Sequence, residues 1–214
     1  MKIQRFSPVA RGTVPSREIL LPLLELSVTR HEQLCPRQVL GVRIGLYGLR
    51  ALGLVDEAYW PRFRNLDKRL LTIVETDGCG ADGIAVATDC HIGRRTLRVV
   101  DYGKVAATLV DIATNRAIRV APSPKARNLA PVCAPDATSR WHAYLEGYQV
   151  MADEQLLRLQ VVQLRQPVTT IISRPNARVI CEQCGEEIMN EREVVCNDRI
   201  LCQSCAGDSY YESQ

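Results

Sequence analysis

Apolar residues that recur three and four positions apart predict two helices near the start of the chain. The first begins at Ser16, whose short polar side chain suits the N-cap, and extends to about residue 34. The second spans residues 36–52, because Pro36 favours a first helical position, where its missing N–H has no intrahelical partner. Glycines on nearly one face of this second helix predict a close approach, most simply by another helix: Gly41, Gly45 and Gly48.

Runs of apolar and β-branched residues predict strands in the middle of the chain. A buried strand is expected over residues 69–77, and a glycine-rich turn then leads into a short helix. The elements expected after it are strands over 96–103, 104–113 and 116–122, a loop over 121–137, a helix over 139–160 and strands over 161–164 and 168–173. This order indicates an α+β fold, in which helices pack on a mixed, largely antiparallel sheet and a small zinc ribbon follows.

The balance of charge changes near residue 174 and marks a domain boundary. Residues 1–180 carry a net charge of +9, whereas residues 181–214 carry −6. We therefore expect an N-terminal arm over residues 1–15, an α+β core over 16–173 and a zinc ribbon over 174–214.

Composition restricts the classes of partner and compartment. The net charge of +3 over 214 residues does not by itself imply a polyanionic partner, and only 5% aromatic residues argue against a base-stacking surface. The chain has no run of about 18 apolar residues and no apolar signal-peptide core near its start, so we expect no membrane segment and a soluble, cytoplasmic protein.

Four of the nine cysteines have the spacing of metal ligands. Cys181 and Cys184 form one Cys-x-x-Cys pair, Cys202 and Cys205 form another, and 17 residues separate the pairs. This spacing predicts a zinc site in which four thiolates surround the ion at about 2.3 Å. The fifth cysteine of this segment, Cys196, is expected to be a spare thiol.

The segment between the two pairs is expected to form a β-hairpin that turns at residues 197–198. So short a ribbon buries too little apolar surface to fold alone, so we expect zinc to supply its folding energy. Its acidity disfavours contact with phosphates, so we expect it to be structural or to bind a protein partner, and not nucleic acid.

Four upstream segments combine Cys, His, Asp and Gly residues: 31–37, 75–83, 88–93 and 101–104. Pro36 disfavours a continuous helix through His31 and Cys35, so Cys35 is expected to cap the next helix. The positive end of that helix favours a thiolate, which can be a metal ligand or a nucleophile. Each segment also has a purely structural interpretation, as a turn, a cap or core packing.

The order of these motifs resembles the FmdE family, which comprises formylmethanofuran dehydrogenase subunits of one type and their bacterial relatives. The motifs are HxxxCP, a glycine-rich helix, ETDGCGADGI, TDCHIG, VDYGK and CxxCGE…LCxxC, over about residues 17–112 and 179–206. The family opens with His-Gly-His-x-Cys-Pro-Gly, and this chain has Gln33, a poor ligand for soft metals, at the second histidine. The resemblance implies a dimeric α+β core with a second metal site, whose candidate ligands are His31, Cys35, Cys79 and Cys90, with His91 behind them.

The resemblance also implies a role in one-carbon or molybdoenzyme metabolism. The chain has no iron–sulfur signature of the C-x2-C-x2-C-x3-C type, so redox chemistry is not assigned to it. We expect a zinc-binding accessory or regulatory protein rather than an enzyme, and a homodimer. Two alternatives are a small metal- or cysteine-dependent enzyme that uses His31, Cys35 and Cys79, and a zinc-ribbon transcriptional regulator.

Overall fold

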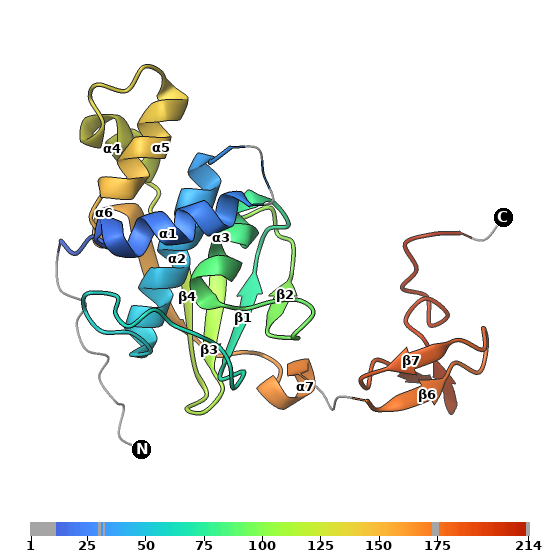
Figure 1. Cartoon of the computed structure of the whole chain (residues 1–214). Helices are drawn as coiled ribbons and strands as arrows, with labels where there is room; N and C mark the ends of the chain where they lie inside the picture. Colours follow the sequence, from blue (N-terminus) through green and yellow to red (C-terminus); the bar gives the residue numbers. More distant parts are fainter. Residues whose placement is uncertain (1–11, 30, 32, 173–175, 213–214) are drawn as a thin grey trace. The chain divides into compact units, whose positions relative to one another are not determined.

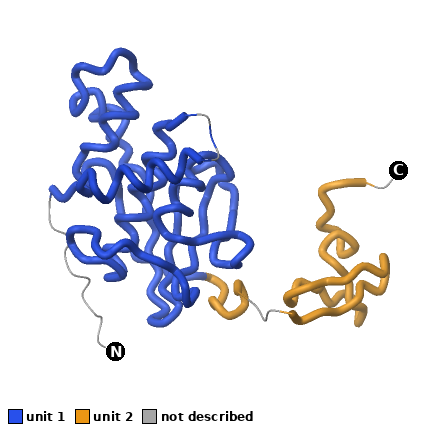
Figure 2. The backbone as a smooth tube through the Cα atoms, in the orientation of Figure 1, with its two compact units in different colours: residues 1–164 blue, residues 165–214 orange. Residues whose placement is uncertain are grey.

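The computed structural model describes residues 12–29, 31, 33–172 and 176–212. It divides into two compact units, Met1–Leu164 and Arg165–Gln214, which are described separately (Figure 2). Residues 1–11 of the expected arm and residues 173–174 at the expected boundary lie outside the described residues. In the described ranges no helix is long and apolar enough to cross a membrane.

Three helices form one layer of the first unit: α1 (Arg17–Val28), α2 (Pro36–Leu52) and α3 (Cys79–Thr88) (Figure 1). The predicted helix over residues 36–52 is confirmed as α2, which is buried along almost its whole length. Its glycines permit the predicted close approach. A methyl group on Gly41 would overlap the carbonyl oxygen of Gly80 in α3, and one on Gly45 would lie 2.6 Å from the Cβ of Ala87. Gly48 faces Leu109 of the sheet instead.

The sheet has five strands in the order β2-β1-β3-β4-β5. The strands are β1 (Leu70–Val74), β2 (Leu97–Val99), β3 (Ala107–Asp111), β4 (Arg116–Pro122) and β5 (Leu157–Val162). Only β1 and β2 pair in parallel, so the sheet is mixed and largely antiparallel, as predicted. Helices α1, α2 and α3 lie on one face of the sheet and enclose the apolar core with it (Figure 1).

Ion pairs join neighbouring parts of the sheet. Arg69 donates to both carboxylate oxygens of Asp111, at 2.9 and 3.0 Å, and Arg119 donates to both of Glu75, at 2.6 Å each. Burial alone would raise the pKa of Asp111, but hydrogen bonds from Arg69 and Thr114 outweigh it and hold the pKa below its ordinary value. Folding is therefore favoured by ionisation of this carboxyl group.

The predicted loop over residues 121–137 is wrong in its middle, where α4 (Ala126–Cys133) forms and packs against α5 (Arg140–Val150). The contact is close: a Cβ atom on Gly147 would lie 2.5 Å from the carbonyl oxygen of Ala130. This packing stabilises a short segment whose proline content favours a loop when judged locally.

The predicted helix over residues 139–160 is also wrong in its second half. Helix α5 ends at Val150, a single turn α6 (Asp153–Leu156) follows, and the chain then enters β5, which pairs with β4. Alternation of apolar and polar residues in β5 suits an edge strand, and pairing with a distant strand overrides the local preference for helix. The predicted strand over 168–173 is instead helix α7 (Val168–Ile172), which begins directly after Pro167.

The end of α5 is fixed by a buried arginine of α2. Arg43 has no exposed surface and donates to the carbonyl oxygens of Tyr148 (2.7 Å), Gln149 (3.3 Å) and Met151 (2.7 Å). It also forms a 2.9 Å ion pair with the buried carboxylate of Asp153. One side chain therefore satisfies carbonyl groups that the helix end leaves without intrahelical partners.

The second unit contains two short hairpins, β6 (Arg178–Ile180) with β7 (Glu187–Met189), and β8 (Val194–Cys196) with β9 (Arg199–Leu201). The predicted hairpin turn is confirmed at Asn197 and Asp198, which both adopt positive φ. Only Cys181, Ile188 and Leu201 form its buried apolar cluster.

Candidate metal centre and paired-thiol cavity

The four cysteines of the second unit converge on one point. The Sγ atoms of Cys181, Cys184, Cys202 and Cys205 all lie within 4.8 Å of one another. Cys181 and Cys184 follow β6, and Cys202 and Cys205 follow β9, so each pair stands at the end of a strand. Gly185 has a φ of 77° directly after the first pair, which allows the tight turn that brings both sulfurs inward.

Backbone N–H groups point at these sulfurs. The N–H of Cys202 donates to Cys181 Sγ at 3.3 Å, and that of Cys205 to Cys202 Sγ at 3.4 Å. Hydrogen bonds from the backbone of Cys184 and Cys202 lower the pKa of Cys181 to about 6. The sulfur of Cys202, followed by burial, raises the pKa of Cys205 to about 12. Four such sulfurs ionise together only around a cation, and a soft thiolate tetrahedron suits Zn²⁺.

Cys196 lies outside this cluster, in β8, and its side chain is exposed. Cys133 is half-buried in α4 and packs against the main core.

The first unit brings together two of the four candidate core ligands. Cys35 is the N-cap of α2 and Cys79 is the first residue of α3, and their thiols are hydrogen-bonded to each other. Burial, and then the hydrogen bond with Cys35, raises the pKa of Cys79 above its ordinary value. The backbone N–H of Cys35 donates to Gln38 Oε1 at 2.8 Å, which completes the cap of α2.

His31 and Cys90 have other partners. His31 Nε2 lies 2.8 Å from Asp82 Oδ2, and Gln33 is exposed. Cys90 is fully buried, and its sulfur accepts hydrogen bonds from Asn65 Nδ2 and Thr72 Oγ1, both at 3.3 Å. Among the residues that the structure describes, the ribbon cysteines are the only group of three or more such side chains with converging ligand atoms.

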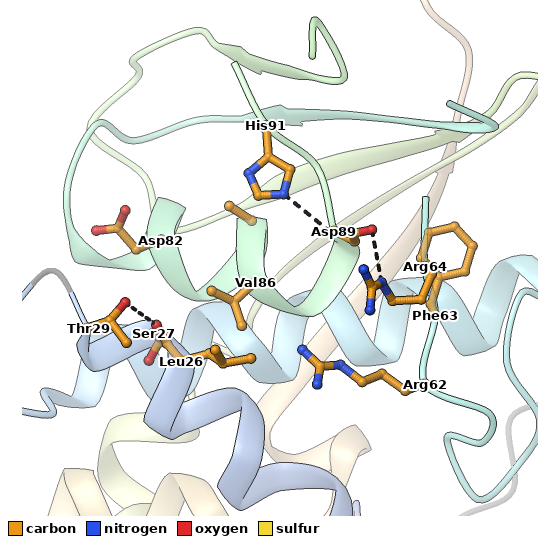
Figure 3. Close-up of a pocket in the computed structure, with 11 residues that line it drawn as sticks. Leu26, Ser27, Thr29, Arg62, Phe63, Arg64, Asp82, Val86, Asp89 and His91 are labelled. Atoms are coloured by element: carbon orange, nitrogen blue, oxygen red, sulfur yellow. Dashed lines mark hydrogen bonds and ion pairs between the residues drawn. The ribbon is translucent and has the colours of Figure 1, made fainter. Parts of the chain in front are cut away.

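A cavity of about 300 Å³ opens between the end of α1, helix α3 and the loop around Phe63 (Figure 3). Asp89 lies at its edge and forms ion pairs with His91 at 3.3 Å and with Arg64 at 3.5 Å. Asp82 lies at the other end of α3 (Figure 3). The ionisable groups on this cavity are thus paired with one another.

A second, larger cavity of about 610 Å³ is lined by both paired thiols. Aromatic residues of α5 line it as well, and sequence reasoning missed them: Trp141, Tyr144 and Tyr148. Their spacing of three and four residues places them on one helix face, which is the signal that could have identified them.

Two family models match the chain. The model described as "FmdE, Molybdenum formylmethanofuran dehydrogenase operon" matches residues 30–174. The model described as "Prokaryotic dksA/traR C4-type zinc finger" matches residues 175–211.

Two known proteins are similar to the chain. A protein of Archaeoglobus fulgidus, named a probable S-adenosyl-L-methionine-binding protein, is 29% identical over 201 residues, which are 85% of this chain and 51% of that protein. The chain thus spans about half the length of this curated relative. The crystal structure of a tungsten formylmethanofuran dehydrogenase FmdE-like protein from Syntrophus aciditrophicus has a TM-score of 0.57 at 21% identity, covering 94% of this chain and all of the other. That likeness shows a shared fold.

Proposed function

Since this chain belongs to the FmdE family, we propose that it is a zinc-binding accessory or regulatory protein linked to one-carbon or molybdoenzyme metabolism. The observation that carries the proposal is the convergence of four cysteine sulfurs within 4.8 Å in a segment that matches a C4-type zinc finger. Bound zinc would supply the stabilisation that the small apolar cluster of the finger lacks.

The donor set supports a structural role for this zinc. Four thiolates close the tetrahedron and leave no position for water or substrate, whereas catalytic zinc keeps one position open. In this interpretation Cys181, Cys184, Cys202 and Cys205 hold the ion, and the hairpins β6–β7 and β8–β9 are held together through it.

A pair of single substitutions tests the zinc site. Cys181→Ser removes a buried member of the cluster, and Cys196→Ser is the matched control because this exposed thiol lies outside it. We expect elemental analysis to find less zinc in Cys181→Ser than in the wild-type chain, and an unchanged content in Cys196→Ser. An equal zinc content in all three proteins would show that the ion is held elsewhere.

The accessory role is supported by the family description, which names the operon of a molybdenum enzyme. We expect deletion of the gene to slow growth on one-carbon substrates and to leave growth on multicarbon substrates unchanged, with recovery by the wild-type gene but not by Cys181→Ser. Equal growth of the deletion strain on both substrates would contradict the metabolic part of the proposal and leave the zinc site untouched.

The proposal includes two statements about partners. We expect a homodimer, as the family resemblance implies, and light scattering coupled to gel filtration measures it directly. We also expect the acidic finger, with eight acidic and two basic side chains in residues 181–214, to bind protein rather than nucleic acid. Sub-micromolar, base-specific binding in a gel-shift assay at physiological salt would instead favour a transcriptional regulator that contacts DNA.

A further inference from the structure

The cavity beside the paired thiols has one aromatic wall. Trp141, Tyr144 and Tyr148 line it from α5, and the rings of Tyr144 and Tyr148 are stacked, with centroids 5.7 Å apart and an interplanar angle of 5°. Trp141 is 39% exposed, so its ring is accessible. Flat ring faces of this kind favour a planar partner in an offset or edge-to-face arrangement.

The remaining wall is apolar and conformationally restricted. Leu40 and Val105 contribute aliphatic surface, and Pro36, Pro122 and Pro124 have fixed φ angles. Its volume of about 610 Å³ falls within the range typical of small-molecule sites, roughly 300–1,000 Å³. A rigid apolar site of this size suits a ring system with a short substituent better than an extended chain.

The charge on the cavity is positive. Arg37 and Arg127 line it, and its lining includes no carboxylate. Arg127 lies 5.9 Å from the centre of the Tyr144 ring and donates to the Tyr148 hydroxyl. Within the described part of the chain, no ion pair joins either guanidinium to an acidic side chain. The N-terminus of α2, at Cys35, adds the positive end of a helix dipole.

We propose that this cavity binds a small molecule that combines a planar aromatic or heteroaromatic ring with a carboxylate or phosphate group. The ring lies against the side chains of α5, and Arg37 and Arg127 neutralise the anionic group. The lining residues all belong to the first unit, so this site is distinct from the zinc cluster and does not depend on it.

Calorimetric titration with two matched pairs of probes tests the proposal. The anions are 2-naphthoate and adenosine 5′-phosphate, and their neutral counterparts are 2-naphthamide and adenosine. Because charge-assisted hydrogen bonds are worth roughly 1.5–3 kcal/mol, at least one anion should bind about tenfold or more tightly than its neutral counterpart. The arm that binds identifies the carboxylate or the phosphate as the preferred group. Equal affinity within both pairs, or no binding by either anion, would overturn the proposal.

Charge-removing variants then test the two arginines. Arg37→Gln and Arg127→Gln change exposed residues, so the fold should persist, and each should weaken the anion about tenfold with little effect on the neutral probe. Arg158→Gln is the matched control, because this exposed arginine of β5 does not line the cavity. An equal loss of affinity in the control, or inorganic phosphate that binds as tightly as the aromatic anions, would contradict a combined ring-and-anion site.

Alkylation of the thiols locates the ligand. Cys35 and Cys79 line the cavity, whereas Cys196 is exposed on the separate finger. A saturating anion should slow the reaction of iodoacetamide with Cys35 and Cys79, measured by peptide mass spectrometry, and leave Cys196 unaffected. Unchanged rates at the paired thiols would place the ligand elsewhere, and zinc analysis of the same samples keeps this outcome separate from the test of the finger.

Discussion

Replacement of Arg43 by methionine should destabilise the first unit by about 3 kcal/mol. The substitution keeps an apolar stem of similar length but removes the guanidinium that binds three carbonyl groups and Asp153. Removal of one partner from a buried ion pair costs roughly 3–5 kcal/mol, and each buried carbonyl group left without a donor costs about 1–3 kcal/mol. We expect the lower end, because Arg50 lies 3.2 Å from Asp153 and continues to neutralise it.

Urea unfolding followed by tryptophan fluorescence measures this loss, because Trp60 and Trp141, the only tryptophans, both belong to the first unit. The slope of the free energy with urea should stay constant while the midpoint falls. Arg158→Met, at an exposed position, should change the stability by no more than about 0.5 kcal/mol. A loss below about 1 kcal/mol for Arg43→Met would refute the view that this side chain fixes the end of α5.

Three further predictions concern packing, zinc and acid stability. Gly41→Ala should destabilise the first unit by about 1–3 kcal/mol in the same urea assay because its methyl group overlaps α3, whereas Gly93→Ala, with open space around it, should be nearly neutral. Zinc affinity, measured by competition with a chromophoric chelator, should fall as the pH is lowered from 7.5 to 5.5, because protons then compete for thiols such as Cys181 (pKa about 6) and Cys205 (pKa about 12). The stabilisation from Asp111, whose folded-state pKa is lowered, is complete above its unfolded pKa and is lost as the pH falls through the folded value. Asp111→Asn should therefore lower the unfolding free energy at pH 7 and reduce its difference from that at pH 3; an unchanged difference would refute this assignment.

Elements with local signals were predictable from the sequence. Pro36 marks the start of α2, and the Cys-x-x-Cys pairs identify the sulfur cluster, because both signals depend on a few adjacent residues. Strand β5 was mistaken for helix because its structure depends on pairing with β4, more than 30 residues earlier in the chain. Such pairing is a tertiary effect that local propensity does not contain.

The larger cavity was harder to predict than the finger. The sequence placed Cys35 and Cys79 in one candidate site, and the structure places their thiols in contact, but His31 and Cys90 have separate partners. Arg127 escaped attention because α4 was expected to be a loop, and the packing that forms α4 depends on Gly147 of the neighbouring helix.

The glycine contact between α2 and α3 also determines how the two thiols can move. Near Gly41 and Gly83 the two main chains touch directly, without intervening side chains that could change rotamer. Cys35 and Cys79 stand at the ends of these two helices, so their separation changes only when a whole helix shifts or its first turn unwinds. The pair therefore acts as a gauge of nearly constant width, which selects by size any ion or reactive group that must contact both sulfurs at once.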